Sequence, residues 1–365
     1  MQKPWFMLVA LLGFGLLATV AVSQKGGENE TGPYNVVEKW PQPFARPGYM
    51  QGSQGGVFAE NPNRIFMANR GEVKIPDPRP ANFNGAWGST GTPATRAMPE
   101  LRNCIIVVDA NGKLVEAWTQ HDHLFQGGRG PHKIKLSPYD PDHSVWVVDD
   151  SRHQVFKFSN DGSKLLLALG EPGVPGNDET HFGRPTDIAF LPDGRFFVSD
   201  GYINTRVVVF SEDGKFLKQW GTPGTGPGQF DLPHSIDIDE NRRVYVADRS
   251  NSRIQIFDES GKFLDQWPNI RQPYHIMIGG DQHLWVSDGV SNKILEYDLE
   301  GKLLQSWGTY GTFPGAFWGV HQFSADFEGN LFLAETFGGR TQKFTPKPGA
   351  ERARILRPRA LALRD

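Results

Sequence analysis

Cysteine is nearly absent from this chain: among its 365 residues, Cys104 is the single one. One thiol cannot form an internal disulfide, and no cysteine directly follows the apolar N-terminal stretch to carry a lipid anchor. Cys104 lies in the apolar run 104–108, where we expect it to pack as a small hydrophobic side chain. The fold must therefore be stabilised by its core alone.

The chain also lacks an excess of charge of one sign. It carries 38 Lys and Arg residues against 41 Asp and Glu residues, which gives a formal net charge of −3 at pH 7. Domains that bind a nucleic-acid duplex normally show a basic excess or a basic stripe, because they neutralise phosphates. We therefore expect no nucleic-acid partner.

A long apolar stretch lies at the N-terminus. Lys3 precedes residues 5–23, which carry no charge and end in the small-residue pattern Ala21-Val22-Ser23. This is the anatomy of a secretory signal peptide. We expect residues 1–23 to be a cleaved signal and the protein to be exported, to the periplasm or the extracellular space. The alternative is an uncleaved membrane anchor, since about 18 apolar residues approach the length needed to span a bilayer.

Turn-forming residues are abundant. The chain contains 42 Gly and 27 Pro, and 12% of its residues are aromatic. Many turns together with many large apolar side chains predict numerous short strands around a sizeable core.

Three short segments recur along the chain, which is the signature of a repeat architecture. One ends in a large apolar residue, and its copies are 36–40, 114–118, 165–169, 216–220, 263–267 and 303–307. A second precedes a short loop, with copies at 64–69, 145–149, 195–200, 243–248, 283–288 and 330–335. A third opens most units, at 131–134, 185–188, 233–236, 273–276 and 319–322, with a weaker copy near 56–58. Six units of four strands, spaced 40 to 54 residues apart, predict an all-β, six-bladed β-propeller.

The order of these segments predicts how the ring closes. An outer-strand segment, 34–40, comes before the first inner strand, whereas the last repeat ends near Phe344 without one. We therefore expect segment 34–40 to complete the last blade. The propeller is expected to occupy residues 24–345 and to be followed by a basic, solvated tail, 346–365.

Histidines recur at one position of the repeat. His132, His234 and His321 stand at the start of the innermost strand in the second, fourth and sixth units. Alternate blades of a six-bladed ring are about 120° apart, so the three imidazoles should surround the channel. Three His ligands with an open fourth position are typical of catalytic zinc. A single histidine would more simply pack or cap, and His275, one residue out of register, is expected to do so.

The second strands of the repeat end on the face where the innermost strands begin. We call this end of the channel the mouth, and we expect three further polar residues there, namely Arg70, Tyr202 and Arg249. An Arg can bind a substrate carboxylate with two parallel hydrogen bonds, and a Tyr beside a metal can act as a general base or a donor. The alternative is that each Arg pairs with a neighbouring Asp and that Tyr202 caps a loop. The segment 71–102 is long enough to cover this mouth as a lid or a rim.

Four stretches carry a family resemblance, and they are 183–187 (GRPTD), 198–206 (VSDGYINTR), 227–235 (PGQFDLPHS) and 246–254 (VADRSNSRI). Through them the repeats resemble the NHL class of propeller. Within that class the chain is similar, over about residues 55–345, to the peptidyl-α-hydroxyglycine α-amidating lyase domain. The resemblance implies zinc bound by His132, His234 and His321, a catalytic Tyr202, and the active-site pair Arg70 and Arg249.

The resemblance also implies a substrate class. Such a lyase cleaves an N-acyl carbinolamine to an amide and glyoxylate, so the expected partner is a small-molecule or peptide-derived substrate with a carboxylate, bound by a monomer. The family Asp that follows the third zinc His and helps to hold a structural calcium is Gln322 here, and the family Met-Pro before that His is Gly319-Val320. The family disulfide cysteines correspond to Gly183 and Ile203. These departures put calcium in question.

Two other functions remain open. One is a non-catalytic NHL propeller that binds a protein or a ligand through its loop-rich mouth. The other is a six-bladed lactonase-type hydrolase. That chemistry usually needs a calcium held by carboxylates and Asn, whereas the innermost strands here begin with histidines.

Overall fold

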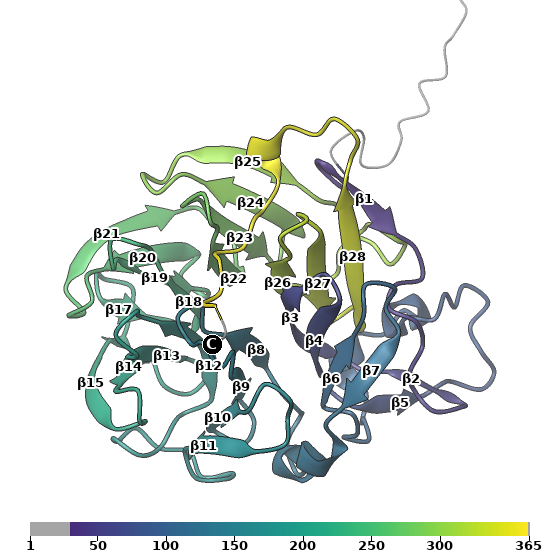
Figure 1. The fold of residues 1–365 in the computed structure, drawn as a ribbon, viewed down its shortest axis with the longest axis horizontal. Coiled ribbons are helices and arrows are strands. Elements are labelled where there is room, and N and C mark those ends of the chain that lie inside the picture. The colour runs from purple at the N-terminus through teal and green to yellow at the C-terminus, as the bar shows by residue number, and fades with distance from the viewer. Residues whose placement is uncertain (1–29, 364–365) are drawn as a thin grey trace, which may run out of the picture.

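The computed structural model describes residues 30–363, which form six four-stranded sheets arranged as a ring (Figure 1). The predicted all-β, six-bladed propeller is therefore confirmed. The predicted signal segment, residues 1–23, lies outside the described residues. None of the helices within residues 30–363 has the length and hydropathy of a membrane-spanning segment.

The strands of each blade are hydrogen-bonded in order from the channel outward. Blade 1 contains β3 (Gln54–Asn61), β4 (Arg64–Asn69), β6 (Ile105–Val108) and β7 (Leu114–Ala117). Blade 2 contains β8 (Lys133–Leu136), β9 (Val145–Asp149), β10 (Gln154–Phe158) and β11 (Leu165–Leu169). Blade 3 contains β12 (Pro185–Phe190), β13 (Phe196–Asp200), β14 (Arg206–Phe210) and β15 (Phe216–Trp220).

The other three blades repeat this pattern. Blade 4 contains β18 (Pro233–Ile238), β19 (Val244–Asp248), β20 (Arg253–Phe257) and β21 (Phe263–Pro268). Blade 5 contains β22 (Pro273–Ile278), β23 (Leu284–Asp288), β24 (Lys293–Tyr297) and β25 (Leu303–Trp307). Blade 6 contains β26 (Val320–Ala325), β27 (Leu331–Glu335), β28 (Arg340–Pro346) and β1 (Tyr34–Val37).

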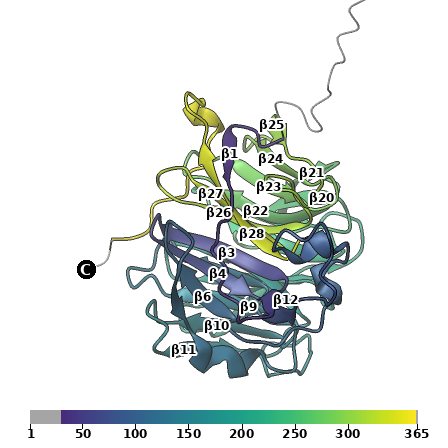
Figure 2. The same ribbon diagram turned by 90° about the vertical axis from the view of Figure 1, so that its right-hand side faces the viewer.

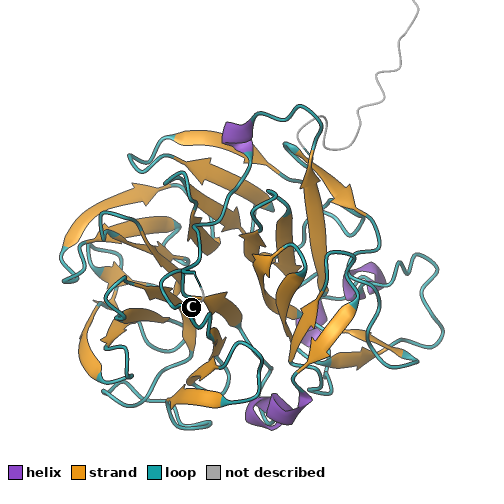
Figure 3. Cartoon of the chain, viewed as in Figure 1, coloured by secondary structure: helices purple, strands orange, loops and turns teal. Residues whose placement is uncertain are grey.

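Short helices and two small sheets lie outside the six blades (Figure 3). Two small sheets pair β2 (Tyr49–Gln51) with β5 (Glu72–Lys74) and β16 (Thr222–Pro223) with β17 (Gln229–Phe230). The short 3₁₀ helices are η2 (Trp87–Thr90), η3 (Ala94–Arg96), η4 (Thr119–Phe125) and η5 (Arg352–Arg354).

Sheet-on-sheet packing stabilises the ring. Every residue of β13 is buried, whereas the outer strand β15 alternates between half-buried and exposed residues. A strand that is covered by neighbouring sheets on both faces is apolar along most of its length. Each apolar cluster combines two neighbouring blades: Phe197 of blade 3 lies in one cluster with Ile236 of blade 4, and the fully buried Cys104 lies between blades 1 and 2. The core is thus distributed around the ring.

The outermost strand of blade 6 comes from the beginning of the described chain. β1 pairs antiparallel with β28, with Tyr34 opposite Pro346. The buried Tyr34 ring lies 5.6 Å from that of Trp307, and its hydroxyl accepts a hydrogen bond of 2.9 Å from the backbone N–H of Leu356. This hydrogen bond joins positions 322 residues apart in the sequence.

The C-terminal segment 351–362 is docked on the propeller, so the expectation of a solvated tail is wrong. Leu356 is fully buried, and Arg359 forms an ion pair of 2.6 Å with Asp237. An apolar side chain and a cation that both find partners can offset the cost of ordering the segment. Figure 1 shows this yellow segment running from the outer edge of blades 5 and 6 toward the channel, and Figure 2 shows its end on one face of the ring.

Segment 71–102 lies over the loops of blade 6 that emerge on the opposite face. The N–H of Gly88 donates to the carbonyl of Gly338 at 2.7 Å, and the N–H of Ala94 donates to that of Phe337 at 3.0 Å. Both acceptors belong to the loop between β27 and β28. Segment 71–102 therefore forms part of the rim on the face where the second strands end.

Leu356→Ala tests how much the docked tail contributes to stability. Removal of a fully buried leucine side chain leaves a cavity, so we expect the free energy of unfolding to fall by about 3 kcal/mol. Urea unfolding followed by tryptophan fluorescence measures the change. Leu363→Ala is the control, because that side chain is 89% exposed and its loss should change stability by less than about 0.5 kcal/mol. Equal stabilities of the two variants would contradict the contribution of the tail.

Candidate metal centre

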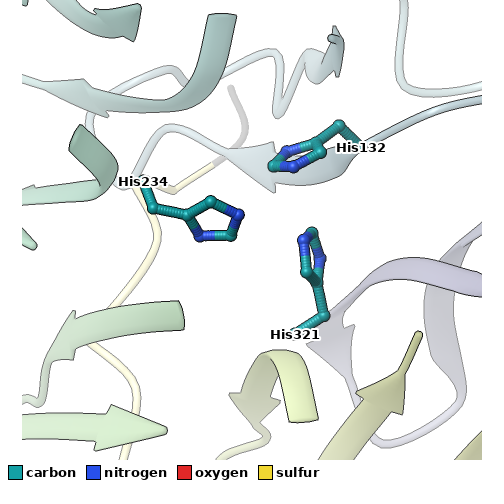
Figure 4. A group of neighbouring side chains, drawn as sticks. All are labelled: His132, His234 and His321. Carbon is teal, nitrogen blue, oxygen red and sulfur yellow. The ribbon is translucent and has the colours of Figure 1, made fainter. Parts of the chain in front are cut away.

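Three histidines converge where the innermost strands of alternate blades begin. His132 directly precedes β8, His234 lies in β18 and His321 lies in β26. The ring centroids are 4.4 Å apart for His132 and His321, 5.0 Å for His234 and His321, and 5.1 Å for His132 and His234. All three rings are buried, and Figure 4 shows them turned toward one another. We call this group the tripod.

Each imidazole of the tripod is oriented by a hydrogen bond to the next blade. The distances from Nδ1 to the accepting carbonyl oxygen are 2.7 Å for His132 to Thr186, 2.6 Å for His234 to Tyr274 and 2.6 Å for His321 to Gly55. Because a carbonyl only accepts, each Nδ1 carries the proton and each Nε2 keeps its lone pair. The ligand atoms of the three rings lie within 4.8 Å of one another.

Burial lowers the pKa of all three tripod histidines well below the ordinary value. Lys133 lowers it further in all three, as do Arg70 for His132 and His321 and Arg249 for His234. The neutral imidazole is the form that binds a metal. Second hydrogen bonds from the ring to carbonyl oxygens are the usual support for metal-binding histidines. Three neutral, oriented imidazoles fit a zinc ion that keeps one position open.

Tyr202 lies beside the tripod. Its Oη is 2.8 Å from Nε2 of His234 and 3.2 Å from Nε2 of His132. Because these nitrogens carry lone pairs, the phenol donates the hydrogen bond. Burial raises the pKa of Tyr202, and the positive charges of nearby arginines oppose that rise. The structure therefore brings this predicted residue next to the predicted ligands as a protonated phenol.

Asp150 interacts with three arginines at the mouth. Its buried carboxylate accepts a hydrogen bond of 3.1 Å from Nε of Arg184 and one of 3.3 Å from Arg129, and it lies 3.6 Å from Nη2 of Arg70. Arg184 also stacks on Tyr202, with 4.2 Å between Cζ and the ring centroid. Three cations around one carboxylate leave a net positive charge beside the tripod, which attracts anions.

Arg249 differs from Arg70 in its partners. Arg70 is paired with Asp150, as the alternative interpretation of the mouth expected. Arg249 instead lies over the ring of Tyr274, with 4.2 Å from Cζ to the centroid, and Nη2 donates to its hydroxyl at 3.3 Å. Its neighbour Asp248 is bound by another arginine, and within residues 30–363 the buried Nε of Arg249 has no hydrogen-bond partner. Arg249 can therefore accept an anionic ligand.

Sequence reasoning did not single out Asp150 or Arg184. A signal for Asp150 was present, because it directly follows β9 as Arg70 follows β4 and Arg249 follows β19. This repeat position supplies a charged group in blades 1, 2 and 4. Arg184 lies in the stretch 183–187 that carried the family resemblance, but nothing in the repeat indicated its contact with the tyrosine ring.

His275 lies outside the tripod. Its Nδ1 is 3.1 Å from the hydroxyl of Ser235 and 3.5 Å from the carboxylate of Asp187. Burial lowers its pKa to about 3, so the ring is neutral. These contacts agree with the packing role expected from its position one residue out of register.

Comparisons with known proteins point to one group. A profile of a family described as a six-bladed β-propeller matches residues 176–266. Mouse peptidyl-glycine α-amidating monooxygenase is 36% identical over 231 residues, which are 60% of this chain and 22% of that protein. A probable peptidyl-α-hydroxyglycine α-amidating lyase of Caenorhabditis elegans is 38% identical over 124 residues, 33% of this chain and 35% of that protein. The chain resembles the amidating lyases.

Two further similarities define the limits of this resemblance. The chain spans about a fifth of the length of the vertebrate monooxygenases that it matches. Human NHL repeat-containing protein 3 is 34% identical over 155 residues, 40% of this chain and 43% of that protein. Among solved structures, a streptogramin B lyase aligns with a TM-score of 0.55 and 13% identity, covering 86% of this chain and 98% of that one. At this identity the structural match establishes the fold alone.

His234→Ala tests the tripod as a metal site. Because one of three ligands is lost, we expect bound zinc to fall from about one per chain to less than about 0.1 after dialysis. Elemental analysis measures zinc, and circular dichroism confirms folding. His123→Ala is the control, because that ring is exposed on η4 and lies outside the tripod. Wild-type protein that binds no zinc from a zinc-containing buffer would contradict the site.

Proposed function

We propose that this protein is an exported, zinc-dependent lyase of the peptidyl-α-hydroxyglycine α-amidating type. It would cleave an N-acyl carbinolamine, R–CO–NH–CH(OH)–COO⁻, into the primary amide R–CO–NH₂ and glyoxylate. The observation that carries the proposal is the phenol of Tyr202, 2.8 Å from one of three converging, neutral histidines. The sequence resemblance to the amidating lyases supports the same chemistry.

The reaction needs a proton transfer but no oxidant. The C–N bond breaks, the carbinol O–H bond is lost as the aldehyde C=O forms, and the amide nitrogen gains one proton. A catalyst for this step must stabilise charge on the carbinol oxygen, move a proton between oxygen and nitrogen, and hold the carboxylate in place.

The residues at the mouth can divide this work. His132, His234 and His321 would hold zinc, which when bound supplies a Lewis acid for the developing oxyanion. Tyr202 can pass its proton to the amide nitrogen while its oxygen takes the proton of the carbinol hydroxyl. The guanidinium of Arg184 on its ring favours any negative charge that develops on the phenol.

Arg249 is the group best placed to bind the substrate carboxylate. Its Nε is buried and unpaired among the described residues, so a carboxylate would satisfy it. Arg70 is already paired with Asp150 and contributes its charge to the mouth. A substrate without a carboxylate would leave the buried Nε of Arg249 without a partner among the described residues.

A second candidate is a non-catalytic binding propeller. The match to human NHL repeat-containing protein 3 favours it, because that name describes repeats and no reaction. The two functions differ in one readout: a binding propeller releases no glyoxylate from an α-hydroxyglycine compound, whatever metal it holds.

Tyr202→Phe removes the proposed proton-transfer group and keeps the ring. We expect the rate of glyoxylate release from an N-acyl-α-hydroxyglycine to fall by about 100-fold or more, the usual contribution of general acid–base catalysis. The zinc content should stay unchanged. Tyr310→Phe is the control, because that ring is 59% exposed. Full activity of Tyr202→Phe would exclude this role.

Arg249→Met tests the carboxylate contact. A charge-assisted hydrogen bond contributes about 2 kcal/mol, so kcat/KM for the α-hydroxyglycine substrate should fall by about 30-fold. The variant should also lose the preference of the wild type for this substrate over its carboxamide analogue. Arg242→Met, which removes a surface guanidinium paired with Asp193, is the control. An unchanged preference in Arg249→Met would show that another group binds the carboxylate.

A further inference from the structure

Gln322 occupies the position at which the family resemblance implies a carboxylate ligand of calcium. Its amide is engaged at both ends by blade 2: Nε2 donates to the carbonyl of Ile134 at 2.7 Å, and Oε1 accepts from the N–H of Ile134 at 3.2 Å. A Cβ on Gly56 would lie 2.1 Å from Oε1, so this packing also requires glycine there. Calcium takes six to eight oxygen ligands and favours carboxylates, and an occupied amide is a poor substitute.

Lys133 brings an amino group into the middle of the ring. The side chain is fully buried, and Nζ donates to the carbonyl oxygen of His321 and, at 3.4 Å, to that of Tyr274. These carbonyls belong to blades 6 and 5, whereas Lys133 opens β8 of blade 2. One side chain thus links three blades and satisfies two carbonyl oxygens, the kind of ligand that a structural calcium would use.

Lys135, also in β8, links blade 2 to blades 3 and 4. Its Nζ donates to the carbonyls of Ile188 in blade 3 at 3.0 Å and Ile236 in blade 4 at 3.2 Å. It also forms an ion pair of 2.9 Å with the buried carboxylate of Asp187, which accepts a further hydrogen bond from Ser235. The two lysines of β8 together contact four other blades. The carboxylate of Asp187 is already bound by Lys135 and Ser235.

The described residues offer no cluster of three acidic or histidine side chains at this place. Across residues 30–363, two groups of histidine or acidic side chains are close enough to share a metal ion: the tripod, and Asp281, His283 and Glu296 in blade 5. Neither contains a carboxylate beside Gln322. A divalent cation here would have to displace Lys135 from Asp187 and lie among basic side chains.

We propose that Lys133, Lys135 and Gln322 take the place of a structural calcium, so that side chains cross-link the centre of this propeller and the fold needs no calcium. The oxygen atoms that would coordinate the ion are satisfied by N–H donors instead. The proposal is independent of the lyase activity, because it concerns the metal content and stability of the fold.

The first test uses the full chain as purified. After dialysis against calcium-free buffer that contains zinc, we expect no stoichiometric calcium by elemental analysis. Calcium is then added at about 100 times the Kd that a structural site would have. The melting temperature should stay unchanged, whereas an ion bound only to the folded state would raise it by about 3 °C or more. Retained calcium that is lost in Gln322→Leu would overturn the proposal. Stoichiometric calcium that persists in Gln322→Leu would also contradict the proposal, because the fold would then hold a calcium ion at another place.

The second test restores the calcium chemistry. In Lys133→Met/Gln322→Asp the amino group is removed and a carboxylate is returned, so we expect a melting temperature that rises with added calcium. Lys133→Met alone should be less stable than the wild type and should not respond to calcium. Lys215→Met is the control, because that side chain is 80% exposed. A wild type that is stabilised by calcium as strongly as the double variant would refute the replacement. If the double variant does not fold, a melting temperature of the wild type that rises with added calcium would refute it.

Discussion

The candidate site depends on one repeated interaction, the hydrogen bond from Nδ1 of each tripod histidine to a backbone carbonyl of the next blade. For His321 this carbonyl belongs to Gly55, 266 residues earlier in the chain, across the junction between the last and first blades. The three lone pairs face one another only when all blades are in register and the ring is closed. The pairing of β1 with β28 in blade 6 therefore supports the geometry of the site as well as the stability of the propeller. Folding and metal binding are expected to be coupled for this reason.

Buried charge is organised in two separate systems around the channel. At the mouth, three arginines share Asp150, and Nε of Arg249 has no hydrogen-bond partner within residues 30–363. Deeper along the innermost strands, Lys135 pairs with Asp187 and the remaining N–H donors bind carbonyl oxygens. Buried ions must be paired and hydrogen-bonded, or their desolvation is too costly. At the mouth positive charge exceeds negative charge, which favours the binding of anions. In the channel the amino groups of the lysines are bound by carbonyl oxygens and by Asp187.

The repeats predicted most of the fold and the centre of the site. Their spacing predicted six blades, and their register placed His132, His234 and His321 on alternate blades. Asp150 was also within reach, because it shares a repeat position with Arg70 and Arg249. The docking of the tail and the contacts of Lys133 could not be predicted from the repeats. Both depend on partners in other blades: Leu356 meets Tyr34, and Lys133 meets Tyr274 and His321. A sequence period describes one blade and its equivalent positions, and it carries no information on which side chains meet across the ring.

The amino-acid sequence by itself determined the type of strand, the number of blades and the equivalent positions of the chemically active residues, because these follow from local periodicity and turn chemistry. Only the tertiary structure decided which nitrogen of each histidine faces the centre, that Nε of Arg249 has no hydrogen-bond partner among the described residues, and which carbonyl oxygens the lysines of β8 bind. Those outcomes depend on distances between segments that are far apart in the chain, and close packing of neighbouring sheets sets such distances.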